Sequence, residues 1–315
     1  MGVRVLLCGM GGYGENYVRE YLTRDVLGSS LAAIADPFAE RSPMYADVVK
    51  KGIPVFKSPD DFYMKNEAEL CVISSPIHTH FPYVMTALEH GSNVLTEKPV
   101  CFRPEQFDAM MQKSKETGLF VAVGYQQCFS GDVLALKRDI LDGVYGKAVR
   151  MKTIRLMRRN DIYYGRSSWA GALKCAGEPV FDSPFTNACA HQFQTMVFLL
   201  GKTMDESVGV KECSGSLVRV RPGITNCDTV QLRFVTDDGV ELYVPRLVES
   251  VAAIVPGRVP RKPCAASGII SGPECSVAAH VVIVKTHHLL GQCIVLGLEC
   301  VRWINTLHLG KVDYV

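Results

Sequence analysis

The chain has 315 residues and a formal net charge of +2, with 34 basic and 32 acidic side chains. This length suits two domains, and a balanced charge without a basic stripe argues against nucleic acid as a partner. An expected strand begins at residue 3, and we find no uninterrupted apolar stretch long enough to span a bilayer. We therefore expect a soluble, cytoplasmic protein with no signal peptide and no membrane partner.

The 12 cysteines form no Cys-x-x-Cys pair, and Cys8, Cys71, Cys101 and Cys189 fall within apolar or helical segments. We interpret them as small buried side chains in a reducing compartment. We also expect no metal site, because the histidines near the C-terminus lack flanking acids and helical spacing. Those histidines are His280, His287 and His288.

A glycine-rich segment follows the first apolar run, Val3–Cys8, and precedes a helical pattern. A strand, a glycine turn and a helix in this order are typical of a dinucleotide-binding unit. Gly9 would permit the tight turn, Gly11 would let the backbone approach a pyrophosphate, and Gly14 would let the helix pack closely. The alternative is a chance turn before a surface helix. The expected cofactor contacts of this segment are Gly9, Gly11, Gly12, Tyr13 and Gly14.

An acidic residue is expected about 20 residues further on, at the end of a second strand. The segment 31–35 is apolar and ends in Asp36, and Pro37 disfavours helical backbone there. A carboxylate in this place accepts hydrogen bonds from ribose hydroxyls and repels a 2′-phosphate, which favours NAD. NADP is the alternative, because Arg41 lies one turn away. Asp36 is also suited to cap a helix that begins near Ala39.

Strands and helices alternate from residue 1 to about 124. Strands are expected near 3–8, 30–35, 53–56, 69–74, 92–96 and 119–124, with helices between them such as 39–50, 81–90 and 105–117. This alternation predicts an α/β fold, a doubly wound parallel sheet of the Rossmann type with helices on both faces. Ligands of such sheets bind outside the carboxyl ends of the strands.

Polar turns follow three of these strands. They are 74–80, Glu97-Lys98-Pro99, and 124–127. We expect them to line one crevice with the glycine turn, and the predicted cofactor contacts among them are Ser74, Ser75, Pro76, His80, Glu97, Lys98 and Gln126. The alternatives are an exposed loop lysine at 98 and helix caps after the fourth strand.

Beyond residue 124 we expect a helix over 132–141, a strand over 147–159 with Arg150, Lys152 and Arg158 toward solvent, and an aromatic loop over 163–171. Aromatic side chains in such a loop either pack on the sheet or line a sugar-sized pocket. Ser183 caps a helix predicted to run to Leu200. Its residues 187, 191 and 194 share a polar stripe that faces either water or the crevice.

The chain resembles the Gfo/Idh/MocA oxidoreductases in six segments, which occur in the same order. They are the glycine turn, Asp36-Pro37, Pro76 to His80, Glu97-Lys98-Pro99, Gly124-Tyr125 and the helix 187–201. The resemblance runs from residue 3 to about 243. It implies an NAD(P)-dependent dehydrogenase of a sugar, cyclitol or related polyol. It also implies a Rossmann domain, 1–124, and a C-terminal α+β domain, 125–315, whose open, mostly antiparallel sheet covers the substrate and builds a homo-oligomer.

The resemblance further implies a catalytic set of Lys98, Asn187 and His191. The lysine would stabilise an alkoxide, and the histidine would take the hydroxyl proton. The family has an aspartate at position 187 to orient the imidazole, so Asn187 implies a weaker base or a role for Asp182. Ile77 and Cys128 also replace the family's usual asparagine and arginine. The alternative function is a catalytically impaired nucleotide-binding protein, either a sensor or a partner of an active paralogue.

The composition changes after Tyr243. Residues 244–315 contain a cluster rich in proline and arginine, 256–263, and few acids: Glu249, Glu274, Glu299 and Asp313. We hypothesise that this tail follows an altered reading frame. The alternative is a divergent end that still folds.

Overall fold

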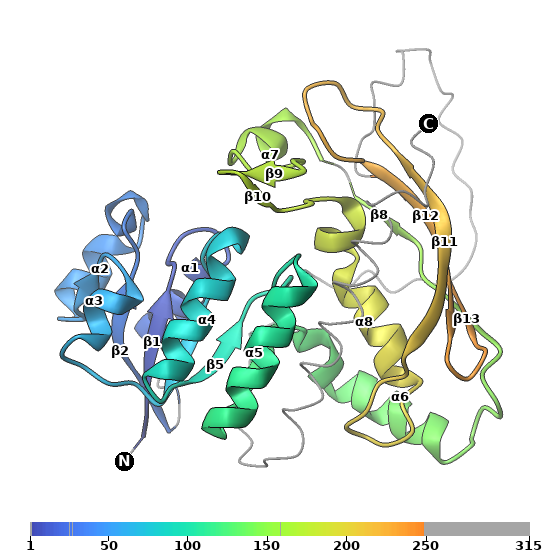
Figure 1. Ribbon diagram of the computed structural model, residues 1–315, viewed down its shortest axis with the longest axis horizontal. Helices are drawn as coiled ribbons and strands as arrows, with labels where there is room; N and C mark the ends of the chain where they lie inside the picture. The colour runs from blue at the N-terminus through green and yellow to red at the C-terminus, as the bar shows by residue number, and fades with distance from the viewer. Residues whose placement is uncertain (1, 25, 27, 158, 249–315) are drawn as a thin grey trace.

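The computed structural model describes residues 2–24, 26, 28–157 and 159–248 (Figure 1). The hypotheses about 249–315, including those on His280, His287 and His288, and the orientation expected for Arg158 lie outside this part of the chain. None of the helices in the described ranges is both long and apolar enough to cross a bilayer.

The first sheet has six strands, which confirms the predicted doubly wound sheet. The strands are β1 (Val3–Cys8), β2 (Ser29–Ala35), β3 (Val55–Phe56), β4 (Leu70–Ile73), β5 (Asn93–Thr96) and β6 (Val121–Val123). Their order is β3-β2-β1-β4-β5-β6, and all neighbours are parallel. The order reverses between β1 and β4, so the segments after these two strands leave the same edge on opposite sides of the reversal.

Helices cover both faces of this sheet. They are α1 (Gly14–Thr23), η1 (Ala39–Arg41), α2 (Tyr45–Lys50), α3 (Pro59–Tyr63), η2 (Ile77–Thr79), α4 (His80–Glu89), α5 (Pro104–Thr117) and, after β6, η3 (Gln126–Phe129). Val5 and Leu7 belong to one core with Val18 of α1, whereas Leu6 belongs to the other core with Phe107 of α5. Both faces are therefore buried, which explains why β1 reads as a continuous apolar run. Figure 1 shows α4 and α5 side by side on one face.

The helix predicted over 39–50 is wrong as a single element. It is divided into η1 and α2, and Ser42 between them has extended backbone, with φ −77° and ψ 136°. The reason is Pro43, because the ring of a proline disfavours helical geometry in the residue before it.

The second half of the described chain is built around a mixed sheet. Its helices are α6 (Gly131–Leu141), α7 (Asp161–Gly165), the π-helical η4 (Pro184–Ala188) and α8 (Ala190–Leu199), and a small hairpin pairs β9 (Lys174–Cys175) with β10 (Glu178–Pro179). The sheet contains β7 (Arg150–Lys152), β8 (Arg155–Leu156), β11 (Val210–Val218), β12 (Thr229–Thr236) and β13 (Glu241–Val248). β11, β12 and β13 are antiparallel, while β7 and β8 pair with β13 in parallel.

The strand predicted over 147–159 is interrupted, because β7 and β8 are separate elements. The partner strand provides the reason. Tyr243 pairs with Lys152 and Leu247 pairs with Arg155, so β13 has one more residue between these pairs than its partner. Pro245 lies at that point and has no N–H to donate to the ladder. Arg150 and Lys152 are exposed, as predicted.

α8 packs on the inner face of the second sheet (Figure 1). Phe193, Met196 and Val197 share one core with Leu232 and Phe234, and the rings of Phe193 and Phe234 lie 4.6 Å apart between centroids. This packing holds the start of the helix beside the first sheet.

The helix predicted over 184–200 is also divided. The N–H of Cys189 donates to the carbonyl of Pro184, five residues back, and Cys189 itself leaves helical geometry with φ −108° and ψ 3°. Asn187 and His191 therefore lie on two differently wound segments. Gln194 is buried, so it does not face water.

Candidate active site

The glycine turn combines two tightly packed glycines with two open ones. Gly9 has φ +88°, and a Cβ added there would lie 2.7 Å from the amide nitrogen of Ser75. A Cβ on Gly14 would lie 2.2 Å from the carbonyl oxygen of Gly9. By contrast, a Cβ on Gly11 or Gly12 would meet no heavy atom within 4 Å. The fold therefore requires glycine at positions 9 and 14. Gly11 and Gly12 instead leave the backbone open for a close-fitting ligand.

Asp36 lies at the tip of β2, next to this turn. Its Oδ2 accepts a hydrogen bond from the amide of Met10 at 2.9 Å, and its Oδ1 accepts one from the amide of Phe38 at 2.8 Å. The carboxylate is half-buried and reaches both the glycine turn and the start of η1. Arg41 is exposed, and its guanidinium stacks 4.3 Å from the centroid of the Phe38 ring.

Several buried polar atoms at the strand exits lack partners. In the described part of the chain, Ser74 Oγ, His78 Nδ1 and Gln126 Oε1 are buried without a hydrogen bond. Ser74 Oγ lies 3.6 Å from the position of a Cβ on Gly14, and the Gln126 amide donates to the hydroxyl of Tyr13 at 2.9 Å. An unsatisfied buried polar atom costs about 1–3 kcal/mol. Such atoms beside an open glycine turn fit a polar ligand.

His80 does not have the surface position expected of a cofactor contact. It is 1 % exposed, and its two ring nitrogens face the carbonyl oxygens of Ser75 and Pro99, each at 2.9 Å. Burial lowers its pKa to about 4, although both carbonyls favour the protonated ring. His80 therefore holds two strand exits together from within. Pro76 is exposed, and Ser75 Oγ bonds to Thr79 Oγ1 at 2.6 Å.

Glu97 is also more internal than the sequence analysis expected. It is 9 % exposed, its Oε1 accepts from the hydroxyl of Tyr17 at 2.9 Å, and a Cβ on Gly124 would lie 2.9 Å from it. Burial raises the pKa of its carboxyl, against the opposing effects of Tyr17 and Lys98. Glu97 thus joins α1 to the turn after β5. Tyr17 was missed, although a tyrosine on the apolar side of a helix needs a partner for its hydroxyl.

Lys98 projects from this turn to the second half of the chain. Its Nζ donates to the backbone carbonyl and to Oδ1 of Asn187, each at 3.1 Å. The structure therefore brings together two of the three residues predicted to be catalytic.

The side-chain amide of Asn187 makes a different set of bonds from the one expected. Its Nδ2 donates to Asp182 Oδ1 at 2.8 Å and to the hydroxyl of Tyr163 at 3.1 Å. None of the described bonds of Asn187 reaches His191, so the expectation that it orients the imidazole is not met. The π-helical winding between the two residues accounts for this difference.

His191 lies against the exit of β6. Its ring meets the ring of Tyr125 edge to face, with 5.9 Å between centroids. The neighbouring residues of α8 also contact this exit, because the Gln192 amide donates to Gln127 Oε1 at 3.4 Å. The first turn of the helix thus adjoins the exit of β6.

The two departures from the family pattern have structural roles. Ile77 packs against the core of the second sheet, and Cys128 is buried with its Sγ 4.0 Å from Thr195 Oγ1 of α8. Both residues fill space between the two halves of the chain.

An arginine near Asn187 was not predicted. The guanidinium of Arg166 lies 3.6 Å from the centroid of the Tyr163 ring and 3.8 Å from Asp182 Oδ2. Its only sequence signal is its place in the aromatic loop. Among the described residues, no group of three or more histidines, cysteines and acids is placed to hold a metal ion.

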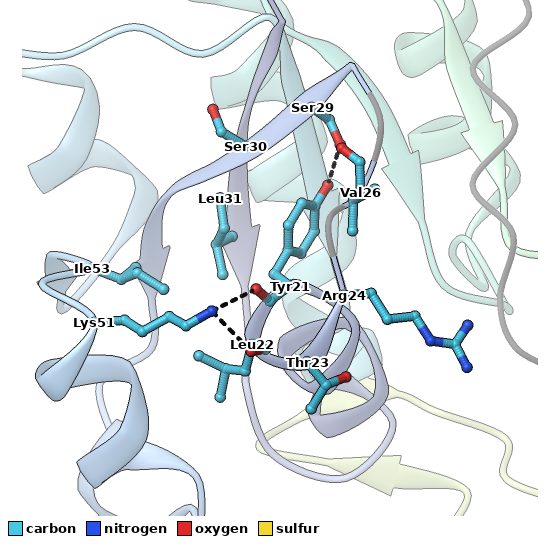
Figure 2. A pocket seen from close by; sticks show the side chains of 10 residues that line it. All are labelled: Tyr21, Leu22, Thr23, Arg24, Val26, Ser29, Ser30, Leu31, Lys51 and Ile53. Carbon is cyan, nitrogen blue, oxygen red and sulfur yellow. Dashed lines mark hydrogen bonds between the residues drawn. The ribbon is translucent and has the colours of Figure 1, made fainter.

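A cavity of about 440 Å³ lies elsewhere, at the end of α1 and the start of β2 (Figure 2). Lys51 closes the end of the helix there by donating to the carbonyls of Leu22 at 2.8 Å and Tyr21 at 3.4 Å. These residues lie at the amino end of the sheet, opposite the glycine turn, and none of them was predicted to bind a ligand.

Residues 3–125 match the model of an oxidoreductase family with an NAD-binding Rossmann fold. The chain is 29% identical over 153 residues to scyllo-inositol 2-dehydrogenase (NAD(+)) of Bacillus subtilis, a match that covers 48% of this chain and 43% of the relative. It is 27% identical over 203 residues to inositol 2-dehydrogenase 4 of Saccharopolyspora erythraea, covering 64% and 54%. The matches therefore span about half the length of these relatives.

The fold is also that of solved dehydrogenases. The WlbA dehydrogenase from Bordetella pertussis, solved in complex with NADH and UDP-GlcNAcA, matches with a TM-score of 0.69 and 19% identity, over 80% of this chain and 72% of that one.

Proposed function

We propose, from the premise that the Rossmann domain of this chain belongs to the Gfo/Idh/MocA oxidoreductases, that the protein is an NAD-dependent dehydrogenase of a sugar, cyclitol or related polyol. The observation that carries the proposal is the contact of Lys98 with Asn187, which joins the exit of β5 to η4, the segment directly before the helix that bears His191. The inositol dehydrogenases among the relatives support this substrate class.

The cofactor residues of this proposal line the glycine turn and the exits beside it. Gly11 and Gly12 leave room for a pyrophosphate, and Asp36 supplies acceptors for the ribose. The other residues proposed to contact the cofactor are Tyr13, Ser74, Ser75, Pro76, Lys98 and Gln126. Four further residues of the predicted set support the site through internal packing and hydrogen bonds: Gly9, Gly14, His80 and Glu97. When bound, NAD supplies the group that accepts a hydride from the substrate carbon.

The catalytic residues act on the substrate hydroxyl. The ammonium of Lys98 stabilises the negative charge that develops on the oxygen, and the imidazole of His191 takes its proton. Asn187 holds Lys98 in place through two oxygens. NADP is the less favoured cofactor, because the carboxylate of Asp36 repels a 2′-phosphate.

The proposal extends to the organisation of the chain. We assign residues 1–124 to the cofactor domain and 125–315 to a substrate domain that forms a homo-oligomer, which light scattering on the purified protein tests. A cytoplasmic location agrees with the eight described cysteines, all of which are free thiols. The altered reading frame after residue 243 is tested by translating the coding DNA in its other two frames; a frame that encodes family-like strands supports it.

The deciding experiment has two stages. NADH binding is titrated by fluorescence, and NADH formation is then followed across a panel of inositols, glucosides and sugar acids. Binding together with turnover of a panel member supports the proposal. Binding without turnover of any member favours the impaired nucleotide-binding protein, and failure to bind NADH contradicts both.

A further inference from the structure

A buried carboxylate lies directly behind Asn187. Asp182 is 4 % exposed, and its Oδ2 accepts from the amide of Gly171 at 2.7 Å and lies 3.8 Å from the guanidinium of Arg166. Its Oδ1 accepts from Asn187 at 2.8 Å. A buried charge requires such partners, and here one of them is the residue that contacts Lys98.

The surrounding groups select one orientation of the Asn187 amide. An ionised carboxylate only accepts hydrogen bonds, and an ammonium only donates them. The observed orientation places Nδ2 against Asp182 and Oδ1 against Lys98. The opposite orientation would place two oxygens in contact at Asp182 and two donors in contact at Lys98. Both contacts would be repulsive.

The segment that bears the carboxylate is itself anchored. The side chain of Asn226 donates to the backbone carbonyl of Asp182 at 3.1 Å. Tyr163, the second acceptor for Asn187, has its ring 3.7 Å from the guanidinium of Arg159 and 3.6 Å from that of Arg166. Asp182 is therefore held rigidly enough to direct its neighbour.

We propose that Asp182 is a positioning residue, whose carboxylate fixes the Asn187 amide so that its oxygen holds the ammonium of Lys98. This inference rests on the proposed function for its catalytic meaning. The carboxylate of Asp182 does not contact Lys98 itself, because the Asn187 side chain lies between them. The atom that contacts the ammonium is the neutral amide oxygen of Asn187. Lys98 is thus held in place without a direct carboxylate partner at position 187, which leaves its charge more effective toward a substrate oxygen.

A charge swap tests the inference in the full-length protein. Asp182→Asn removes the charge, and the double variant Asp182→Asn with Asn187→Asp restores one carboxylate and one amide in reversed places. We expect Asp182→Asn to lower kcat by about 10- to 100-fold, with KM for NAD unchanged, because a displaced catalytic group costs a factor of this order. The double variant should recover at least about a third of the loss on a logarithmic scale. An unchanged kcat in Asp182→Asn overturns the inference.

A second measurement does not depend on turnover. The rate at which acetic anhydride acetylates Lys98 is followed by peptide mass spectrometry. We expect about a threefold or greater increase in Asp182→Asn, since an amide free to reorient no longer holds the ammonium, and a rate at or below that of the wild type in the double variant. Tyr163→Phe is the control, because it removes the other acceptor and leaves the carboxylate in place; its rate should stay within about twofold.

These readouts separate the two proposals. If the wild type turns over no panel substrate, the proposed function fails, while the acetylation rates still decide the role of Asp182. Equal rates in the wild type and Asp182→Asn overturn the inference. If Asp182→Asn does not fold, as judged by circular dichroism, the double variant decides: acetylation faster than in the wild type overturns the inference, and an equal or slower rate supports it.

Discussion

Lys98 and Asn187 are separated by 89 positions in the chain, yet the ammonium of the first donates to both oxygens of the second, each at 3.1 Å. This contact joins the turn after β5 of the parallel sheet to η4, the π-helical segment that precedes α8. It places a cation where the exits of the first sheet meet the second half of the chain.

Replacing Lys98 by methionine removes the ammonium and keeps a side chain of similar length. We expect kcat for the best panel substrate to fall by about 100- to 1,000-fold, as it does when one group that stabilises a developing oxyanion is lost. NADH affinity, measured by fluorescence, should also fall, because Lys98 belongs to the cofactor set, but by about tenfold or less, which is a smaller loss than that in kcat. A variant that retains more than a tenth of wild-type kcat would remove Lys98 from the catalytic set.

The glycines of the turn should separate into two classes. Gly14→Ala places a methyl group 2.2 Å from the Gly9 carbonyl oxygen and should destabilise the fold by about 3 kcal/mol or more. Gly11→Ala meets no atom within 4 Å and should leave the melting temperature nearly unchanged while weakening NADH binding at least about tenfold. Calorimetry and fluorescence titration measure the two effects. Normal NADH affinity in a folded Gly11→Ala protein would contradict the cofactor site.

Asp36 should determine the choice between NAD and NADP. We expect Asp36→Ser to reduce the preference for NAD at least about tenfold, because the carboxylate that repels a 2′-phosphate is lost. The measurement is the ratio of kcat/KM for the two cofactors. Arg41→Ala is the matched control and should leave the wild-type ratio in place. A wild type that prefers NADP would show that Arg41, rather than Asp36, decides the specificity.

His80 should make the fold less stable in mild acid. Its pKa is about 4 in the folded protein and 6.5 ordinarily, so the unfolded chain binds the extra proton between these values. The stabilisation is present above pH 6.5 and is lost as the pH falls toward 4. Urea unfolding should show that, between pH 7.5 and pH 5, the wild type loses up to about 2 kcal/mol more than His80→Gln does. Identical losses would mean that folding does not lower the pKa of His80.

Glu97 should have the opposite effect. Burial raises the pKa of its carboxyl above the ordinary 4.5, so the folded protein holds the proton more tightly than the unfolded chain. The stabilisation is present below pH 4.5 and is lost as the pH rises through the folded pKa. Glu97→Gln keeps an acceptor for Tyr17 and removes this dependence. As the pH rises from 4.5 to 7.5, the free energy of unfolding of the variant should therefore increase relative to that of the wild type. If the difference between the two free energies stays constant over this range, burial does not raise the pKa of Glu97.

The sequence alone determined the first sheet and the position of Asp36 beside the glycine turn, where we propose that the cofactor binds. Apolar runs, glycine positions and the Asp36-Pro37 pair act through the conformation of a few neighbouring residues, so they can be interpreted without the fold. Even the break in the predicted helix at 39–50 has a local cause in Pro43, a signal that was present in the chain and was overlooked.

Only the tertiary structure decided how the other residues act. Whether Glu97 and His80 face a ligand or the interior depends on Tyr17, Gly124 and the backbone of Pro99, which reach them across the sheet. The partners of Asn187 depend in the same way on a π-helical turn and on the loop that bears Tyr163. Burial and hydrogen bonding between distant segments are properties of packing, and residue spacing along a chain does not contain them.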